Sequence, residues 1–378
     1  MVDFFKSSKL SIDWILLGSI LPIIGAGLVT MNSFALSNAY FDHQLIWFSV
    51  SLVAFFFVSF IDVSFLKRTN VVVTLYIIIL SVLGLLFILG TVSKGAQSWF
   101  SFGGFSIQPI DPAKLVLILI LAKYFSRRHV EIAHVRHIII SGLYALIVFL
   151  LVFLQPDFGG ALIIFAIWFG MVLVSGISKK HLMIVGCIGL VSFTLLWNFV
   201  FHDYQKKRIL NFLHPLADVR GSGYNAYQAT ITVGSGEILG KGVGFGTQSR
   251  LKFLPEYETD FIFAAFAEEW GFIGVLFLFI LYGIMLWRIL DNAMHGASNF
   301  ELLYGLGLSF FFMSHIIVHV GMNLGLMPVT GLTIPFMSYG GSNMLTSFIA
   351  LGILMSMRRY SRGAHRDSIK NEFLGLVN

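Results

Sequence analysis

The sequence has few charged residues: Asp, Glu, Lys and Arg together make up 12% of its 378 residues. A soluble domain would carry roughly 25%. Hydrophobic residues make up 57% of the chain, and its mean hydropathy is +0.85. Its apolar runs are continuous, and several reach the ~20 residues that a helix needs to cross a bilayer. This pattern excludes a soluble globular domain and a β-barrel, and it predicts an all-α polytopic membrane protein.

Cysteine is scarce, and no cleavable leader is expected. Cys187 is the single cysteine and lies in an apolar run, so no disulfide can form within the chain and redox chemistry is not expected. The N-terminal stretch MVDFFKSSKLSIDW has no small-residue cleavage site after a short apolar core, so we expect no signal peptide.

About ten membrane-spanning helices are predicted, and the fourth is short for a span. Lys and Arg gather at alternate ends of the apolar runs, which the positive-inside rule assigns to the cytoplasm. Both termini are therefore predicted to be cytoplasmic, in a single integral membrane domain of residues 1–378 with a cytoplasmic tail at 359–378. The predicted spans are 13–31, 45–65, 71–91, 111–124, 137–154, 158–176, 182–200, 260–287, 303–322 and 344–358. The basic residues at the cytoplasmic ends are Lys6, Lys9, Lys67, Arg68, Arg127, Arg128, Arg136, Lys179, Lys180, Arg288, Arg358, Arg359, Arg362, Arg366 and Lys370.

A large extracytoplasmic loop is predicted between the seventh and eighth spans, at residues 201–259. It is basic although it lies on the outer side, and a loop of this length is more often functional than connective. The alternative is a solvated loop that touches anionic headgroups. Its basic residues are Lys206, Lys207, Arg208, Arg220, Lys241, Arg250 and Lys252.

Ionisable residues inside apolar segments are costly and often mark an interior cavity. The stretch GAQSWFSFGGFSIQPIDPAK, residues 95–114, predicts an interfacial or re-entrant loop that leads into a helix. Asp111 and Lys114 would share a face of its first turn. They could form a neutral capping pair, or Lys114 could meet an anionic ligand while Asp111 orients it. Asp157, after Pro156, is expected mainly to cap the next helix.

The stretch FLPEYETDFIFAAFAEEWG, residues 253–271, places Asp260 at the outer mouth of the eighth span. A straight helix from Asp260 to Trp287 would measure about 42 Å, so its first turns would project into the outer interface. Glu268 and Glu269 would then lie about 12–13 Å deeper, and we expect them to be mainly structural. Capping alone is a weak explanation for Asp260, because Ser or Asn would serve equally well.

Residues 321–344 carry no charge and are too apolar for a free aqueous loop. Irregular backbone at membrane depth must be buried by protein or line a cavity. We therefore predict a re-entrant segment that floors an outward-facing pocket. Its SYGGS stretch could offer backbone N–H groups to an anion.

Several of these motifs together resemble the SEDS family (shape, elongation, division and sporulation) over nearly the whole chain. They are QPIDPAK, QPDFGGA, YQKKRILNFLHP, MPVTGLTIPFMSYGGS and the long stretch from GSGYNAYQ to TDFIFA. GTQS followed by LKFLPE is more similar to the RodA branch than to the FtsW branch. The resemblance implies a ten-span peptidoglycan glycosyltransferase that polymerises lipid II at the outer face of the bacterial cytoplasmic (inner) membrane, for cell elongation and rod shape. It also implies a class B penicillin-binding protein and other elongation-machinery proteins as partners, contact with membrane lipids, and no nucleic acid.

The resemblance assigns the candidate catalytic role to Asp260 and matches Lys114 to the family's lysine. This sequence departs from the family pattern in several places: Asp111 replaces a Glu, Glu258 replaces a His, His319 replaces an Asn, and the loop segment QATITVGSG lacks the lysine usual in the family. The shorter acid at Asp111 raises the question of whether it still reaches Lys114.

Asp260 is expected to act as general base, and Lys114, with Arg208 or Lys207, to neutralise a pyrophosphate. The glycine-rich run from Gly234 to Gly246 is expected to approach sugar closely. The remaining residues predicted to bind substrate are Asp111, Lys241, Gln248, Ser249, Glu256 and Ser338. No cofactor is required by this scheme. A divalent cation, Mg²⁺ or Mn²⁺, near Asp260 or Glu256 could assist, although no dedicated metal cage is visible.

Three alternatives stay open on the sequence alone. A lipid II flippase would also need basic intramembrane groups, but no convincing inverted repeat of QPIDPAK or SYGGS is present. The departures from the family pattern leave room for a non-enzymatic scaffold that activates a penicillin-binding protein. A related ligase acting on another polyprenyl-linked glycan would use the same chemistry.

Overall fold

The computed structural model describes most of the chain, with short gaps between its segments. The described ranges are 12–33, 39–93, 96–102, 105–127, 135–199, 201, 203–214, 223–251 and 253–373. Several predicted basic residues lie outside them, as do parts of the 201–259 loop and the end of the tail. These basic residues are Lys6, Lys9, Arg128, Arg220 and Lys252.

Each of the ten predicted spans overlaps one long helix within the described residues, which confirms the all-α polytopic fold. The helices are α1 (Trp14–Asn32), α2 (Ala39–Phe60), α3 (Thr69–Leu89), α4 (Ile110–Ser126), α5 (Val135–Leu154), α6 (Phe158–Val174), α7 (Lys179–Phe199), α11 (Ile262–Met294), α12 (Asn299–Asn323) and α13 (Gly341–Phe373). A short 3₁₀ helix, η2, covers Ser64–Lys67. In the described part of the chain, seven helices are long and apolar enough to cross a membrane (α1, α2, α3, α5, α7, α11 and α12), and α6 is a shorter apolar helix.

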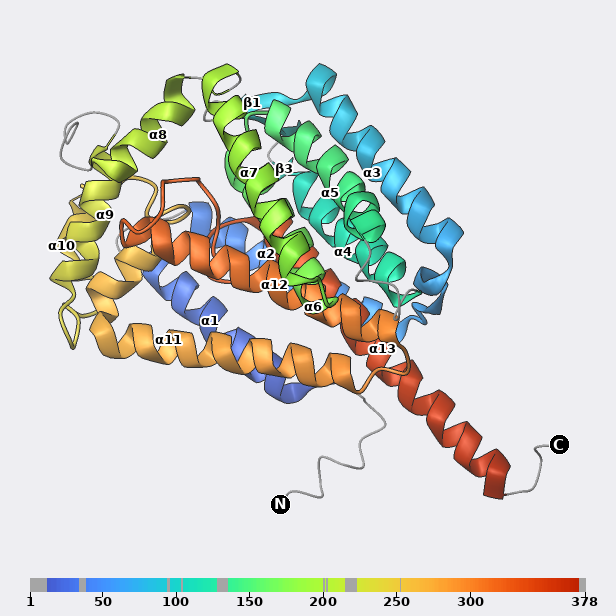
Figure 1. Ribbon diagram of the computed structural model, residues 1–378. Coiled ribbons are helices and arrows are strands. Elements are labelled where there is room, and N and C mark those ends of the chain that lie inside the picture. The colour runs from blue at the N-terminus through green and yellow to red at the C-terminus, as the bar shows by residue number, and fades with distance from the viewer. Residues whose placement is uncertain are drawn as a thin grey trace.

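α12 is central to the bundle and packs against α4, α6 and α11, while α2 packs along α13 and α1 along α11. Figure 1 shows α8, α9 and α10 gathered at one end of the bundle and α13 projecting from the other. α11 and α13 both run from the first end, near Ile262 and Gly341, toward the second, where Arg288 and Arg358 lie. The positive-inside prediction assigns the second end to the cytoplasm.

Two connections are more ordered than the sequence suggested. Three short strands, β1 (Thr91–Ser93), β2 (Ala96–Phe102) and β3 (Phe105–Ile107), form an antiparallel sheet. Strand pairing satisfies backbone groups that an irregular loop would leave open. This sheet leads directly into α4, as expected. The 201–259 loop contains three helices: α8 (Asp203–Leu213), α9 (Tyr224–Ser235) and α10 (Thr247–Arg250).

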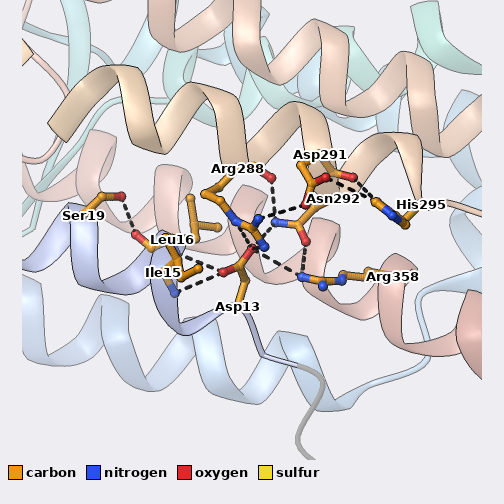
Figure 2. Close-up of polar contacts among 9 residues, drawn as sticks. All are labelled: Asp13, Ile15, Leu16, Ser19, Arg288, Asp291, Asn292, His295 and Arg358. Atoms are coloured by element: carbon orange, nitrogen blue, oxygen red, sulfur yellow. Dashed lines mark hydrogen bonds and ion pairs between the residues drawn. The ribbon is translucent and has the colours of Figure 1, made fainter. Parts of the chain in front are cut away.

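Buried charges join three helices at the end opposite α8–α10. Asp13, 4% exposed, caps α1 by accepting the N–H groups of Ile15 and Leu16. Figure 2 shows Arg288, Asn292 and Arg358 converging on the same carboxylate from α11 and α13. The Arg288 guanidinium lies 2.6 Å from Asp13 Oδ2, and Asn292 Nδ2 donates to that oxygen at 2.8 Å. This network ties the ends of α1, α11 and α13 together.

α11 is broken at Gly271, whose backbone is non-helical (φ 65°, ψ −167°). The expectation of one continuous helix of about 42 Å from Asp260 to Trp287 is therefore wrong: the helix begins at Ile262 and is interrupted at Gly271, just after Glu268 and Glu269. The loop between α9 and α10 fills the break: Phe272 N–H donates to the Glu237 carbonyl at 3.0 Å, and Lys241 N–H to the Glu268 carbonyl at 2.9 Å.

The glycines of this loop are needed for close backbone approach. A Cβ at Gly236 would overlap the Ala267 carbonyl oxygen, and one at Gly240 would overlap that of Glu269. The sequence prediction assigned the 234–246 run to sugar contact. The structure instead packs Gly236 and Gly240 against the α11 backbone, since only residues without a side chain fit there.

Candidate functional site

A cavity of about 560 Å³ lies at the end of the bundle where α11 and α13 begin, and Arg208 of α8 is on its wall. This volume is within the range of small-molecule sites. Five predicted site residues line it, contributed by α4, by α8 and by the segment before α11: Asp111, Lys114, Arg208, Glu256 and Asp260. The irregular segment between α12 and α13 contributes Thr330, Gly331, Leu332, Thr333, Tyr339 and Gly340. That segment therefore lines a pocket, as predicted.

Asp260 lies in a turn just before α11 and is half-buried on the cavity wall. The N-cap position of α11 belongs to Phe261, so Asp260 is not placed there to cap the helix. Asn323, at the end of α12, fixes the turn: its Nδ2 donates to the Asp260 carbonyl at 3.1 Å, and its Oδ1 accepts the Ala264 N–H at 3.1 Å. Gly331 leaves space in front of the carboxylate, since a Cβ there would lie 3.7 Å from Asp260 Oδ2.

Ser338 and Tyr339 hold the residues immediately before Asp260. Ser338 Oγ donates to the Thr259 carbonyl at 2.9 Å and accepts the Ile334 N–H at 3.0 Å. The Tyr339 N–H donates to the Glu258 carbonyl at 2.9 Å. Ser338 was predicted to bind substrate, but it is 4% exposed and is not among the residues that line the cavity. Its hydroxyl instead positions the turn that carries Asp260.

Glu256 begins the same turn and is exposed at the cavity, with a positive φ of 55°. Its carboxylate accepts the Thr259 hydroxyl at 2.9 Å. Its carbonyl accepts the N–H groups of Thr259 and Phe261. The left-handed backbone closes the turn, so Glu256 shapes the segment as well as lining the cavity.

Asp111 and Lys114 form a buried ion pair on the first turn of α4. Each is 2% exposed, and Lys114 Nζ lies 3.1 Å from Asp111 Oδ1. The shorter acid therefore does reach the lysine. Asn343 donates to the same carboxylate oxygen at 3.4 Å, and His315 Nε2 lies 3.3 Å from Lys114 Nζ. A buried pair needs such additional hydrogen bonds to offset its desolvation.

Asp157 caps α6, which confirms the capping prediction: its Oδ1 accepts the Gly160 N–H at 2.8 Å. The other carboxylate oxygen accepts from Gln108 Nε2 at 3.3 Å. Asp157 also lines the cavity. Asp157 therefore both caps α6 and forms part of the cavity wall.

Arg208 reaches the cavity from α8, but the neighbouring Lys207 does not line it and is exposed. Consecutive residues of an α-helix point about 100° apart, so α8 can turn only one of the two toward the cavity. Of the two basic residues proposed beside Lys114, the geometry favours Arg208.

Lys241, Gln248 and Ser249 also lie away from the cavity wall and surround Glu268 instead. Lys241 Nζ lies 2.8 Å from Glu268 Oε1, the Gln248 backbone N–H donates to the same oxygen at 3.0 Å, and Ser249 donates to Oε2 at 3.4 Å. Glu268 is fully buried, and a buried carboxylate needs several donors. These three residues therefore anchor α10 and the loop before it to α11.

Sequence reasoning missed the aromatic part of the wall. It consists of Tyr40, Trp47, Trp99, Phe158 and Tyr339. The rings of Tyr40 and Tyr339 meet edge to face at 4.9 Å. Burial raises the pKa of Tyr339, with Tyr40 adding to the shift, so its phenol stays neutral at physiological pH.

Two histidines on the wall, His43 and His315, were also missed. For His315 a signal existed, because HIIVH places His315 and His319 on one face of a predicted span. Ionisable residues inside a span are candidates for function by default.

In the described part of the chain, no three His, Cys, Asp or Glu side chains group closely enough to hold a metal ion. Asp260 and Glu256 line the cavity and could each offer a carboxylate oxygen, which Mg²⁺ and Mn²⁺ accept. An ion would then need the bound ligand to complete its coordination. The divalent cation stays a prediction.

Comparison with known proteins gives consistent matches over most of the chain. The family model for FtsW, RodA and SpoVE, described as "Cell cycle protein", matches residues 9–363. Stage V sporulation protein E of Bacillus subtilis is 33% identical over 368 residues, covering 94% of this chain and 99% of that protein. The peptidoglycan glycosyltransferase MrdB of Escherichia coli is 35% identical over 291 residues, covering 76% and 78%.

A chain of similar structure occurs in a solved peptidoglycan synthase complex, described as "Structural coordination of polymerization and crosslinking by a peptidoglycan synthase complex". The two chains superpose with a TM-score of 0.80 at 31% identity, covering 92% of this chain and 98% of that one. The similarity therefore extends to the whole helical bundle that carries the cavity.

Proposed function

The chain belongs to the FtsW/RodA/SpoVE family, the SEDS proteins, and we propose that it is a glycosyltransferase which polymerises lipid II into glycan strands. The observation that carries the proposal is the single cavity shared by Asp260, Lys114 and Arg208. A carboxylate that can accept a proton and two cations that can meet a pyrophosphate are the groups that this transfer requires. The name of the relative MrdB supports the same reaction class.

In the proposed reaction, the 4-hydroxyl of a GlcNAc attacks the anomeric carbon of the MurNAc at the growing end. A C–O bond forms, the bond from that carbon to the pyrophosphate oxygen breaks, and the pyrophosphate leaves with the electron pair. Asp260 takes the hydroxyl proton as general base. Lys114 and Arg208 offset the charge that develops on the leaving group, and the planar guanidinium of Arg208 suits bidentate contact with phosphate oxygens.

The proposal sets this chemistry at the outer face of the bacterial cytoplasmic membrane. Asp260 lies just before α11, and Arg288 lies near the other end of that helix. Arg288 is one of the basic residues predicted to be at the cytoplasmic ends of the spans. The cavity end would then be the outer end. Ion pairs of Asp13 with Arg288 and Arg358 hold α1, α11 and α13 together at the other end, which supports one-sided chemistry rather than alternating access.

We assign the chain to elongation and rod shape, the role of the RodA branch, because of its GTQS and LKFLPE segments. The sporulation relative is similarly close and covers more of the chain, so this finer assignment depends on those segments. A class B penicillin-binding protein is the proposed partner. The solved synthase complex with the similar chain couples polymerisation to crosslinking, which supports this partner.

A polymerisation assay on the purified protein tests the proposal. Lipid II is supplied with and without the cognate penicillin-binding protein, in the presence of moenomycin to silence unrelated polymerases. We expect glycan strands from the wild-type protein and almost none from Asp260→Asn, which keeps the size of the side chain and removes its basicity. Near wild-type polymerisation by the variant would show that Asp260 is not the base.

The same preparation separates the rival functions. Lipid II movement across liposomes without polymer would favour a flippase. A partner that polymerises only in the presence of this chain, and equally well with Asp260→Asn, would favour a scaffold.

A further inference from the structure

His315 lies on α12 at the cavity, and the reaction outlined above gives it no part. Its side chain is 1% exposed and makes two polar contacts at the two ring nitrogens. Nδ1 lies 3.0 Å from the carbonyl oxygen of Thr333, in the irregular segment before α13. Nε2 lies 3.3 Å from the ammonium nitrogen of Lys114 on α4. The imidazole thus joins three parts of the chain.

The identity of the two partners fixes the proton on the ring. The Thr333 carbonyl oxygen can only accept a hydrogen bond, so Nδ1 must carry the hydrogen and donate it. The Lys114 ammonium can only donate, so Nε2 must be unprotonated and accept. A single neutral tautomer of His315 satisfies both contacts. A charged imidazolium would place two cations 3.3 Å apart.

Lys114 is held from two sides as a result. Asp111 Oδ1 accepts a hydrogen bond from Lys114 Nζ at 3.1 Å. Both residues lie on the first turn of α4, so this hydrogen bond alone does not tie the flexible lysine side chain to another helix. His315 accepts from a different helix, and the Phe311 ring lies 5.9 Å from Lys114 Nζ beside the imidazole. Two of the three ammonium hydrogens are directed at these acceptors. The third is left for a ligand in the cavity.

We propose that His315 is a positioning residue: its Nε2 lone pair holds the Lys114 ammonium at the cavity wall, where it meets the anionic pyrophosphate of the substrate. This inference rests on the proposed function, since it assigns the lysine a pyrophosphate to meet. It adds a residue that acts through Lys114 and does not itself touch substrate.

Two substitutions separate the contacts of the imidazole. The amide of Asn can occupy the place of Nδ1, so His315→Asn keeps a donor for the Thr333 carbonyl and loses the acceptor for Lys114. The amide of Gln reaches the place of Nε2, so His315→Gln keeps an acceptor for Lys114 and loses the tie to Thr333. The two variants are matched controls for each other.

The kinetics of lipid II polymerisation are then measured for both variants. We expect His315→Asn to lower kcat/KM about ten- to hundredfold, because a hydrogen bond to a charged group is lost. We expect His315→Gln to stay within about threefold of wild type. The reverse order would overturn the proposal and leave His315 as an anchor for the Thr333 segment only.

A double-variant cycle tests the same point without relying on the Gln variant folding. In a Lys114→Met background, His315→Asn should cause no further loss, because there is no ammonium left to position. Full additivity of the two losses would refute the proposal. Polymerisation by the wild-type protein in the same assay separates this result from a failure of the proposed function, which would abolish activity in every variant and in the wild type.

Discussion

Replacing Asn323 by Ala is expected to weaken the fold and the activity together, because this one buried amide joins α11 and α12 at the Asp260 turn. Asn323 is fully buried. Its Oδ1 accepts the Ala264 N–H at 3.1 Å, and its Nδ2 donates to the carbonyls of Asp260 at 3.1 Å and His319 at 2.8 Å. Ala removes all three hydrogen bonds and supplies none.

The magnitude follows from the two groups that lose a buried partner. The Ala264 N–H belongs to the first turn of α11, where no backbone acceptor is available, and the Asp260 carbonyl lies in a turn. Leaving a buried donor or acceptor unsatisfied costs about 1–3 kcal/mol each, so we expect a loss of about 2–6 kcal/mol in the free energy of unfolding.

Asn198 offers a matched control. It is exposed, and its Nδ2 donates to the Thr194 carbonyl at 2.8 Å, the same four-residue spacing as the contact of Asn323 with His319. Asn198→Ala should therefore change the unfolding free energy by less than about 1 kcal/mol.

Unfolding by SDS in mixed micelles measures the stability, and lipid II polymerisation measures the activity. We expect Asn323→Ala to unfold at lower SDS than Asn198→Ala and to lower kcat more than it raises KM, since the displaced group is the base. If the two alanine variants unfolded together and polymerised equally, the claim that Asn323 positions the Asp260 turn would be refuted.

Three further outcomes follow from described contacts. Gly240→Ala should cost about 3 kcal/mol or more by SDS titration, because a Cβ would overlap the Glu269 carbonyl at a φ of 79°, whereas Gly234→Ala, with open space around it, should be neutral or slightly stabilising. Asp13→Asn should cost about 3–5 kcal/mol, since two partly buried arginines lose the charge of a buried carboxylate, and a change below about 1 kcal/mol would contradict a structural role for that network. Lys114→Met should lower the rate of polymerisation about ten- to a thousandfold while the protein still folds; unchanged kinetics would reduce the lysine to a packing role.

Much of the helical framework could be predicted because hydropathy is a local property of the chain. Each apolar run became a helix, and the cap at Asp157 formed from a turn and a carboxylate that are neighbours in sequence. Lys114 and Asp111 paired for the same reason, since they are three residues apart on one helix. The sheet of β1, β2 and β3 escaped prediction because two of its strands, β1 and β3, are only three residues long and give no clear period-2 pattern.

The candidate site was predicted in part. Asp260, Lys114, Arg208, Glu256 and Asp111 do share one cavity. Ser338, Lys241 and Ser249 were also expected there, but they bond to groups away from the cavity: Ser338 to the Thr259 carbonyl, and Lys241 and Ser249 to the Glu268 carboxylate. These partners lie in distant segments of the chain, so no local pattern indicated them. Glu268, for example, draws its donors from a loop about 20 residues earlier in the chain.

Local sequence was enough to establish that this chain is a membrane bundle, where its helices run, and which charged groups are too costly to lie in lipid, because each of these depends on residues close together in the chain. Which polar groups meet could be learned only from the folded bundle. His315 and Lys114 are 201 residues apart, and Asn323 and Asp260 are 63 apart. Their contacts depend on how α4, α11 and α12 pack, and that packing follows from side-chain shape across the bundle rather than from any local pattern.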